Sequence, residues 1–359
     1  MLNKDQRTAG IKKRDPFFDN ARFILVALVV LGHLISPVRE GNDILFFANN
    51  FLASFRMPAL ILLTGYFTKH FRRDSSLFIK QLAVSIFIPY LIFQVFYLGM
   101  DGLAGNWMQL WANLFAPSFG MWFLLSLLAW NLLLFPFTKL KHPIFFAFLL
   151  AIGIGWVDGA GEYLSISRTL VFFPLFLMGH YLKKEQMEWF KKKKAKVLAV
   201  FSMIASSVIL SIFSLEQARN LLLARQPYAE IAESAIEGSG ARLIFYVVML
   251  LGILSFLPWV PKKDMFFTHL GRRTAYIYLL HLFFVRVLTE MNLFPSEPGI
   301  WFFIALLFAW PAIVFFVSSG TVVLLVKPVV EGKGVVHFFQ DIPSFFKTAN
   351  QLSWLTYKK

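Results

Sequence analysis

Long apolar runs alternate with short polar segments along the whole chain. A helix needs about 20 residues to cross the roughly 30 Å hydrocarbon core of a bilayer, and ten runs have about that length. The 143–158 and 168–182 runs are the shortest, so their limits are the least defined. The pattern predicts about ten membrane-spanning helices, over residues 18–37, 44–68, 77–99, 119–138, 143–158, 168–182, 196–214, 242–259, 274–291 and 300–326.

Composition supports the same class of protein. Of the 359 residues, 58% are hydrophobic and 15% are charged, and the mean hydropathy is +0.64. Soluble domains carry about a quarter charged residues, so we expect an all-α integral membrane protein. The first apolar run has no small-residue cleavage site after it, which favours a retained first span. The predicted organisation is a cytoplasmic N-terminal segment (1–17), a transmembrane domain (18–326) and a cytoplasmic tail (327–359) with aromatic and lysine spacing suited to a membrane surface.

The basic residues predict the orientation. With the N-terminus inside, 27 of the 35 Lys and Arg fall in cytoplasmic segments, and the outer loops keep five: Arg39, Arg168, Arg219, Arg225 and Arg242. Positive residues remain inside because they resist translocation during insertion. Both termini are therefore predicted to be cytoplasmic. The net charge of +15 reflects this topology, and the basic run at 191–194 is interpreted as a solvated inner loop, with no nucleic acid as partner.

Three arginines remain within the apolar runs: Arg22, Arg56 and Arg286. Each costs roughly 3 kcal/mol there on insertion scales. We therefore expect each to face a partner or a water-filled cavity. The alternative for each is an anchor that reaches lipid phosphate.

Arg22 and His33 form the sharpest pair. Eleven residues at 100° each bring His33 about 20° past three full turns from Arg22, and roughly 16 Å along the axis. The two side chains thus share one helix face, with His33 beyond the midplane toward the outside. Asp19 is three residues before Arg22, which makes it a candidate to hold its guanidinium. The alternative for His33 is a hydrogen-bonded packing residue.

The second and ninth runs hold further candidates. In SFRMPALILLTGYF, Arg56 approaches from the outer side, Pro58 removes a helical hydrogen bond, and Thr64-Gly65 lets another helix come close. His281 lies mid-span near two tyrosines, where catalysis and packing against a tyrosine are both open. The chain has no cysteine, which excludes a cysteine-linked acyl intermediate, and no metal-ligand or nucleotide-binding motif.

The following segments together resemble the acyltransferase 3 family, in order, from about residue 14 to 325. RDPFFDNARFILVALVVLGH is similar to its first helix, whose hallmark is Arg or Lys, ten residues, then His. SFRMPALILLTGYF is similar to its second-helix element, with Thr64 where Ser is common. GMWFLLSLLAWNLLLF, RTLVFFPLFLMGHYLKK and HLGRRTAYIYLLHLF resemble later helices of the fucose 4-O-acetylase-like branch.

The resemblance implies an acyltransferase that moves a non-aminoacyl group in a bacterial cytoplasmic membrane. It implies acetyl-CoA or another acyl-CoA as donor, with no permanently bound cofactor, and a hydroxyl of an extracytoplasmic glycan or other cell-surface acceptor. His33 would be the general base, while Arg22 and Arg56 would bind donor phosphates or the developing oxyanion. Asp19, His281 and Arg286 are secondary candidates, and no metal is implied.

Two other functions remain open on the residues alone. Intramembrane Arg and His would also line the path of a transporter or exporter of a glycan or small molecule, but no paired Gly- or Pro-broken helices occur in matching halves of the chain. A scaffold or sensor leaves the register of Arg22 and His33 unexplained. Acceptor recognition would rest on outer loops 100–118, 157–167 and 215–241, with Trp107, Trp111 and Trp156 as stacking surfaces.

Overall fold

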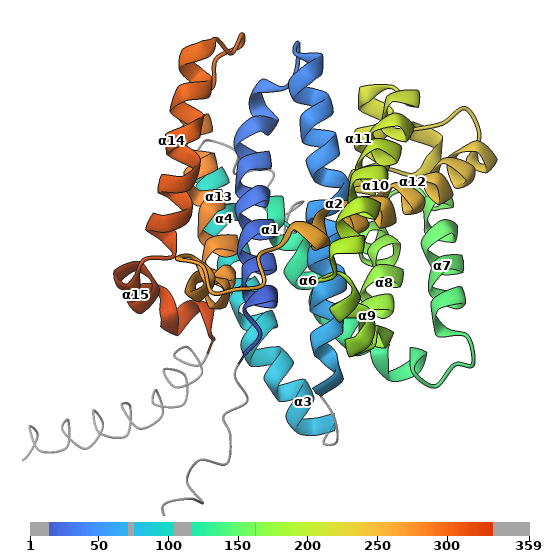
Figure 1. Ribbon diagram of the computed structural model, residues 1–359. Helices are drawn as coiled ribbons and strands as arrows, with labels where there is room; N and C mark the ends of the chain where they lie inside the picture. Colours follow the sequence, from blue (N-terminus) through green and yellow to red (C-terminus); the bar gives the residue numbers. More distant parts are fainter. Residues whose placement is uncertain (1–13, 71–74, 104–115, 162, 333–359) are drawn as a thin grey trace, which may run out of the picture.

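The computed structural model describes residues 14–70, 75–103, 116–161 and 163–332, and these contain helices and no strands. The helices form one bundle in which α1 and α2 run side by side through the centre (Figure 1). Their bounds are α1 Pro16–Ile35, α2 Asp43–Phe67, α3 Ser75–Leu82, α4 Ile88–Leu103, α6 Trp122–Phe137, α7 Pro143–Gly153, α8 Ile166–Tyr181, α9 Lys184–Trp189, α10 Lys193–Ile212, α11 Leu215–Leu223, α12 Ala235–Phe256, α13 Thr274–Glu290, α14 Ile300–Val317 and α15 Gly320–Val330.

Six helical stretches of the described chain are long and apolar enough to cross a membrane: Pro16–Val38, Asp43–Phe67, Leu77–Gly102, Lys193–Ile212, Ala235–Trp259 and Ile300–Val317. Three shorter apolar helices accompany them, over Trp122–Phe137, Pro143–Trp156 and Gly320–Val330. The fold is therefore that of an all-helical, multi-pass membrane protein. The count of about ten spans and the cytoplasmic location of both termini stay predictions.

Local sequence explains where α1 and α2 begin. The side chain of Asp15 accepts a hydrogen bond from the backbone N–H of Phe17 at 3.1 Å, and Pro16 occupies the first turn of α1. Asn42 caps α2 in the same way by accepting from Leu45 N–H at 3.0 Å. Pro58 lies inside α2 without ending it.

α2 packs closely against α8 through two glycines. A Cβ at Gly65 would overlap the carbonyl oxygen of Phe176, and one at Gly179 would overlap the carbonyl oxygen of Leu62. The two backbones therefore touch where side chains are absent. This confirms the prediction that Gly65 admits a neighbouring helix.

Two predicted segments differ from the observed helices. The predicted run 300–326 is divided between α14 and α15 at Ser318-Ser319, because Ser319 caps a new helix that continues past the predicted domain limit to Val330. The predicted loop 215–241 contains a helix, α11, and α12 already begins at Ala235, capped by Ser234.

The stretch from α3 to α4 was predicted as one regular helix and contains a π-helical turn over Ala83–Phe87. Such turns insert one residue into a helix and often occur at functional sites. Ser85 and Ile86, in this turn, line a cavity that also contains Arg22. The irregularity thus shapes one wall of the candidate site.

Candidate active site

The central helices enclose two cavities, and each contains one residue of the Arg22–His33 pair. The cavity that we call the His33 cavity has a volume of about 630 Å³, and the one that we call the Arg22 cavity has a volume of about 340 Å³. Both are bounded by α1, α2, α4, α6 and α13. The predicted helix face is thus the face along which the two cavities lie.

The cavities lie end to end and are separated by a thin layer of side chains. On α2, Met57 lines one cavity and Leu60, one turn away, lines the other. On α6, the consecutive residues Trp122 and Phe123 line different cavities. The two cavities therefore both lie along α1, on either side of these residues.

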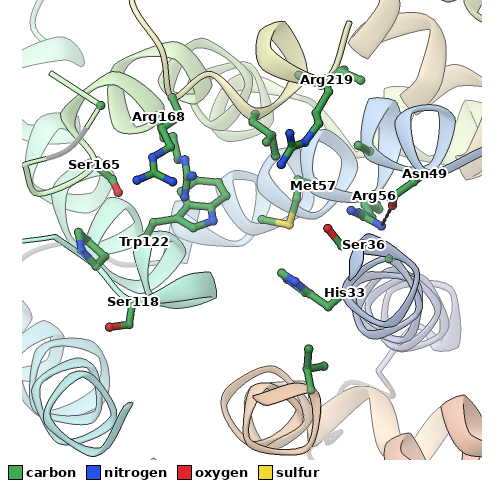
Figure 2. Close-up of a pocket in the computed structure, with 18 of the residues that line it drawn as sticks. His33, Ser36, Asn49, Arg56, Met57, Ser118, Trp122, Ser165, Arg168 and Arg219 are labelled. Carbon is green, nitrogen blue, oxygen red and sulfur yellow. Dashed lines mark hydrogen bonds between the residues drawn. The ribbon is translucent and has the colours of Figure 1, made fainter. Parts of the chain in front are cut away.

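His33 projects from α1 into its cavity (Figure 2). In the described part of the chain, no hydrogen bond occupies its ring. The ring of His281, on α13, lies 5.3 Å away between centroids. The sequence placed these two histidines as separate candidates, and the fold brings them together.

His281 is fully buried, and its Nδ1 donates a hydrogen bond to the carbonyl oxygen of Ile277 at 2.9 Å. Because a carbonyl only accepts, this bond assigns the proton to Nδ1 and leaves Nε2 as an acceptor. Nε2 is buried and has no hydrogen-bond partner among the described residues. The partner of His281 is therefore a backbone carbonyl, not the tyrosine that the sequence offered as an alternative, although the Tyr278 ring lies 5.9 Å away between centroids.

Arg56 lies beside His33 on the wall formed by α2. Its Nη1 donates to the side-chain oxygen of Asn49 at 3.3 Å and to the carbonyl oxygen of Leu28 at 3.4 Å. The guanidinium occupies the space that a Cβ at Gly32 would fill. A fixed cation is thus held next to the candidate base.

Arg22 lies on α1 in the second cavity, the Arg22 cavity. Its guanidinium carbon is 4.1 Å from the centre of the Phe67 ring, a cation–π contact. The candidate partner, Asp19, instead pairs with Arg14 at 3.1 Å and with Arg272 at 3.9 Å. In the described chain, no carboxylate lies within ion-pair distance of Arg22, so Asp19 acts on its guanidinium only as a nearby charge and does not form the ion pair that the sequence offered.

Arg286 is ion-paired at the edge of the His33 cavity. It contacts Asp101 on α4, and its Nε lies 3.3 Å from Glu290, one turn further along α13. The sequence left open whether Arg286 serves the site or anchors in lipid. Its charge is neutralised by carboxylates of the protein, so it holds α13 against α4.

Four arginines that sequence analysis assigned only to outer loops also line the His33 cavity: Arg39, Arg168, Arg219 and Arg225. Figure 2 shows Arg168 and Arg219 around the space into which His33 points. Burial, together with the like charge of Arg219, lowers the pKa of Arg39. Their sequence positions indicate only topology, because the four residues lie in separate parts of the chain and no local spacing places them around one cavity.

Among the proposed stacking residues, Trp156 is exposed and donates a hydrogen bond to Ser239 at 3.0 Å. It does not line the His33 cavity, whereas Trp122 does. Trp107 and Trp111 lie outside the described residues. In the described part of the chain, no group of three or more metal-ligating side chains occurs.

The all-helical bundle and the cavity that contains His33 and several arginines define the class as a multi-pass membrane protein with a polar cavity between its helices. The family model described as an acyltransferase domain, that of acyltransferase 3, matches residues 15–326, and the chain belongs to this family. It is therefore a membrane acyltransferase, an enzyme that transfers acyl groups other than aminoacyl groups. No curated protein and no solved structure matches the chain.

Proposed function

We propose that this enzyme transfers an acyl group, with acetyl as the expected case, from cytoplasmic acyl-CoA to a hydroxyl of an extracytoplasmic glycan or similar cell-surface acceptor. The observation that carries the proposal is the pair of cavities along α1, with a cation in one and an imidazole in the other. This arrangement suits a donor and an acceptor that arrive from opposite sides of a membrane. The chain would then act in a bacterial cytoplasmic membrane, in the branch of the family that acylates sugar hydroxyls.

On the donor side, Arg22 is suited to a phosphate of acyl-CoA. Its guanidinium has no carboxylate partner in the described chain, and the Phe67 ring supports one of its faces. The rest of the Arg22 cavity is largely apolar, with Val26, Leu60 and Leu279 among its lining residues. An apolar channel below a cation fits a pantetheine arm whose thioester points toward His33.

On the acceptor side, His33 is suited to general-base catalysis. Its ring takes the proton of the acceptor hydroxyl as the oxygen attacks the thioester carbonyl, so that a C–O bond forms. The C–S bond then breaks, and the proton passes to the departing thiolate of CoA. Arg56, fixed beside His33 by Asn49, is placed to stabilise the negative charge that develops on the carbonyl oxygen.

His281 is suited to orient His33 and is not required to carry the proton itself. Its Nδ1 proton is committed to Ile277, whereas its Nε2 can accept a proton or a hydrogen bond. Replacing it is therefore expected to disturb the position of His33. The effect should be smaller than that of replacing His33.

The test compares His33→Gln with His281→Gln and the wild type in cells that display the acceptor. Glutamine keeps hydrogen bonding and roughly the volume of histidine, but it cannot accept and release a proton near neutral pH. We expect both variants to be inserted at normal levels. His33→Gln should lose about 10² to 10⁴-fold in surface O-acylation, and His281→Gln should lose less. Full acylation by a well-expressed His33→Gln protein would overturn the proposal.

A further inference from the structure

The His33 cavity is lined by five arginines that come from separate parts of the chain: Arg39, Arg56, Arg168, Arg219 and Arg225. The only carboxylate among the described residues that line it is Asp101. Asp101 is already paired with Arg286, which does not line the cavity. The cavity wall therefore carries a large excess of positive charge.

Protein groups neutralise these arginines only in part. Arg39 pairs with Glu40 at 3.8 Å, and Arg219 pairs with Glu216 at 2.9 Å, but both glutamates are largely exposed to solvent. In the described chain, neither Arg56 nor Arg168 has a carboxylate within ion-pair distance. The Nε of Arg168 is buried without a hydrogen-bond partner there, and its guanidinium lies over Trp122, 5.2 Å from the ring centre.

Grouping several arginines around one cavity lowers the stability of the protein unless a ligand compensates for it. Like charges that face a partly enclosed cavity repel one another more strongly than charges in bulk water, and a buried donor without an acceptor loses its hydration. An anion in the cavity would remove both costs. The cavity should therefore bind a negatively charged ligand in preference to a neutral one.

The residue type is as informative as the charge. All 21 lysines of the chain fall in segments predicted to be cytoplasmic, and the cavity cations are all arginines. Arginine presents a planar fork of donors that matches phosphate and carboxylate oxygens, whereas lysine is a point charge. Positively charged residues are scarce on the predicted outer side of the membrane, and those that line the cavity are all arginines. This choice of residue indicates that the cavity recognises an oxyanion.

The segment that carries Arg219 and Arg225 is fastened over the cavity. Arg242, fully buried on α12, donates to the carbonyl oxygen of Leu221 at 2.6 Å. Asn50 of α2 donates to the carbonyl oxygen of Leu215 at 2.8 Å. Ser167 of α8 donates to the carbonyl oxygen of Ala224 at 2.9 Å. Bonds from three helices thus fix α11 and the residues after it, so the arginines are held in place before any ligand binds.

We propose that the acceptor is an anion: a glycan or polyol unit that carries a phosphate or carboxylate group near the hydroxyl that is acylated. This inference rests on the proposed function, because it takes the His33 cavity to be the acceptor site. The arginines of α8 and α11 hold the anionic group, and this places the neighbouring hydroxyl at His33. A neutral sugar lacks the group that these arginines recognise.

The first experiment measures binding without a donor. The full-length protein in nanodiscs of zwitterionic lipid is titrated with glucose 6-phosphate, with glucuronate and with uncharged glucose, and its melting temperature is followed. We expect both anions, and not glucose, to raise the melting temperature, with an effect that salt weakens.

The double variant Arg168→Gln/Arg219→Gln should raise the apparent Kd about tenfold or more, while Lys192→Gln, an exposed control, should leave it unchanged. Equal stabilisation by glucose, or stabilisation by the anions that survives in the double variant, overturns the inference.

The second experiment separates an acceptor from the phosphates of the donor. Free CoA is added in the same assay to Arg22→Ala and to the double variant. Stabilisation by CoA should be lost in Arg22→Ala and kept in the double variant, and the reverse result would make the cavity a donor site and overturn the inference.

A transfer assay with labelled acetyl-CoA then tests the proposed function on its own. We expect acetyl transfer to the anionic probes by the wild type and none by His33→Gln. Anion-selective binding with no transfer by either protein would overturn the proposed function, whereas transfer to glucose and the anions alike, without selective binding, would overturn only the inference.

Discussion

At the scale of single residues, the candidate site depends on a glycine next to His33. Gly32 directly precedes His33, and the guanidinium of Arg56 fills the space where its Cβ would be. Any other residue at this position would push Arg56 away from the imidazole. A glycine that is unremarkable in an apolar helix thus allows a cation and a base to lie side by side.

We therefore predict that Gly32→Ala keeps the fold but lowers acyl transfer. The overlapping group is the far end of a flexible side chain, so Arg56 can move aside and the helix need not. Losing one oxyanion donor costs about 10² to 10³ in kcat, and a displaced donor should cost at least about tenfold. Steady-state kinetics with acyl-CoA measure this. Gly153→Ala, where an added Cβ meets nothing, is the matched control, and normal kcat in Gly32→Ala would contradict the role of Arg56.

Arg22 gives a second prediction at this scale. Arg22→Ala removes the cation of the donor cavity, and the KM for acyl-CoA should rise about tenfold or more, because a charge-assisted bond to phosphate is lost. Arg22→Lys should be intermediate, since it keeps the charge but not the planar fork over Phe67. The melting temperature should change little in both. A KM that stays normal in Arg22→Ala would leave Arg22 as a membrane anchor.

Sequence reasoning could reach the residues that carry their signal in local spacing. The eleven-residue interval between Arg22 and His33 predicts their common helix face because helix geometry alone determines it. Spacing along the helix also makes Asp19 a candidate partner of Arg22, but the structure shows no ion pair between them. Its carboxylate instead meets Arg14 and Arg272, and the second of these comes from a distant loop that spacing cannot reveal.

At the scale of elements, the α2–α8 contact holds together two walls of the His33 cavity. Arg56 and Arg168 lie on these two helices, and Gly65 and Gly179 bring the two backbones into contact near the C-terminal end of each helix. A polar contact accompanies them, in which Thr68 Oγ1 and His180 Nδ1 are 2.8 Å apart. The distance between the two arginines is therefore set partly by residues far from the cavity.

We predict that Gly65→Ala destabilises the protein. The new Cβ would overlap a backbone carbonyl of α8, which cannot rotate away, and overpacking of this kind costs about 1–3 kcal/mol. Thermal unfolding in detergent should show a clear fall in melting temperature. Gly99→Ala, where nothing lies near the added Cβ, is the control and should leave the melting temperature unchanged. An unchanged melting temperature in Gly65→Ala would mean that the close contact between α2 and α8 does not stabilise the protein.

Sequence also predicted the elements unevenly. The lengths of the apolar runs predict the bounds of α1, α2 and α10 well, because each helix is one apolar run between polar segments. It could not mark the break between α14 and α15, where apolar residues continue on both sides and only Ser318-Ser319 interrupts the helix. The role of α11 as a support for two arginines depends on bonds from three other helices, which no local pattern contains.

At the scale of the whole molecule, the positions of the two cavities along α1 give the enzyme a direction. The His33 cavity is lined in part by α11, and the Arg22 cavity is lined by residues nearer the N-terminal end of α1. If the 27-to-5 division of basic residues reports the orientation, the acceptor reaches His33 from outside the cell and the donor reaches Arg22 from the cytoplasm. The opposite orientation would bring both substrates to the wrong ends.

The orientation is testable because the chain has no cysteine, so one introduced thiol reports one site. Lys192→Cys places it next to α9, and Glu233→Cys places it between α11 and α12, and both positions are exposed.

We predict that a membrane-impermeant maleimide labels Glu233→Cys in intact cells, and labels Lys192→Cys only after the membrane is opened. Both variants should keep wild-type acyl transfer, since neither residue lines a cavity. Labelling in the reverse order would turn the His33 cavity toward the cytoplasm. An extracytoplasmic acceptor could then not reach the imidazole, and the direction of transfer proposed here would have to be abandoned even if His33 proved essential.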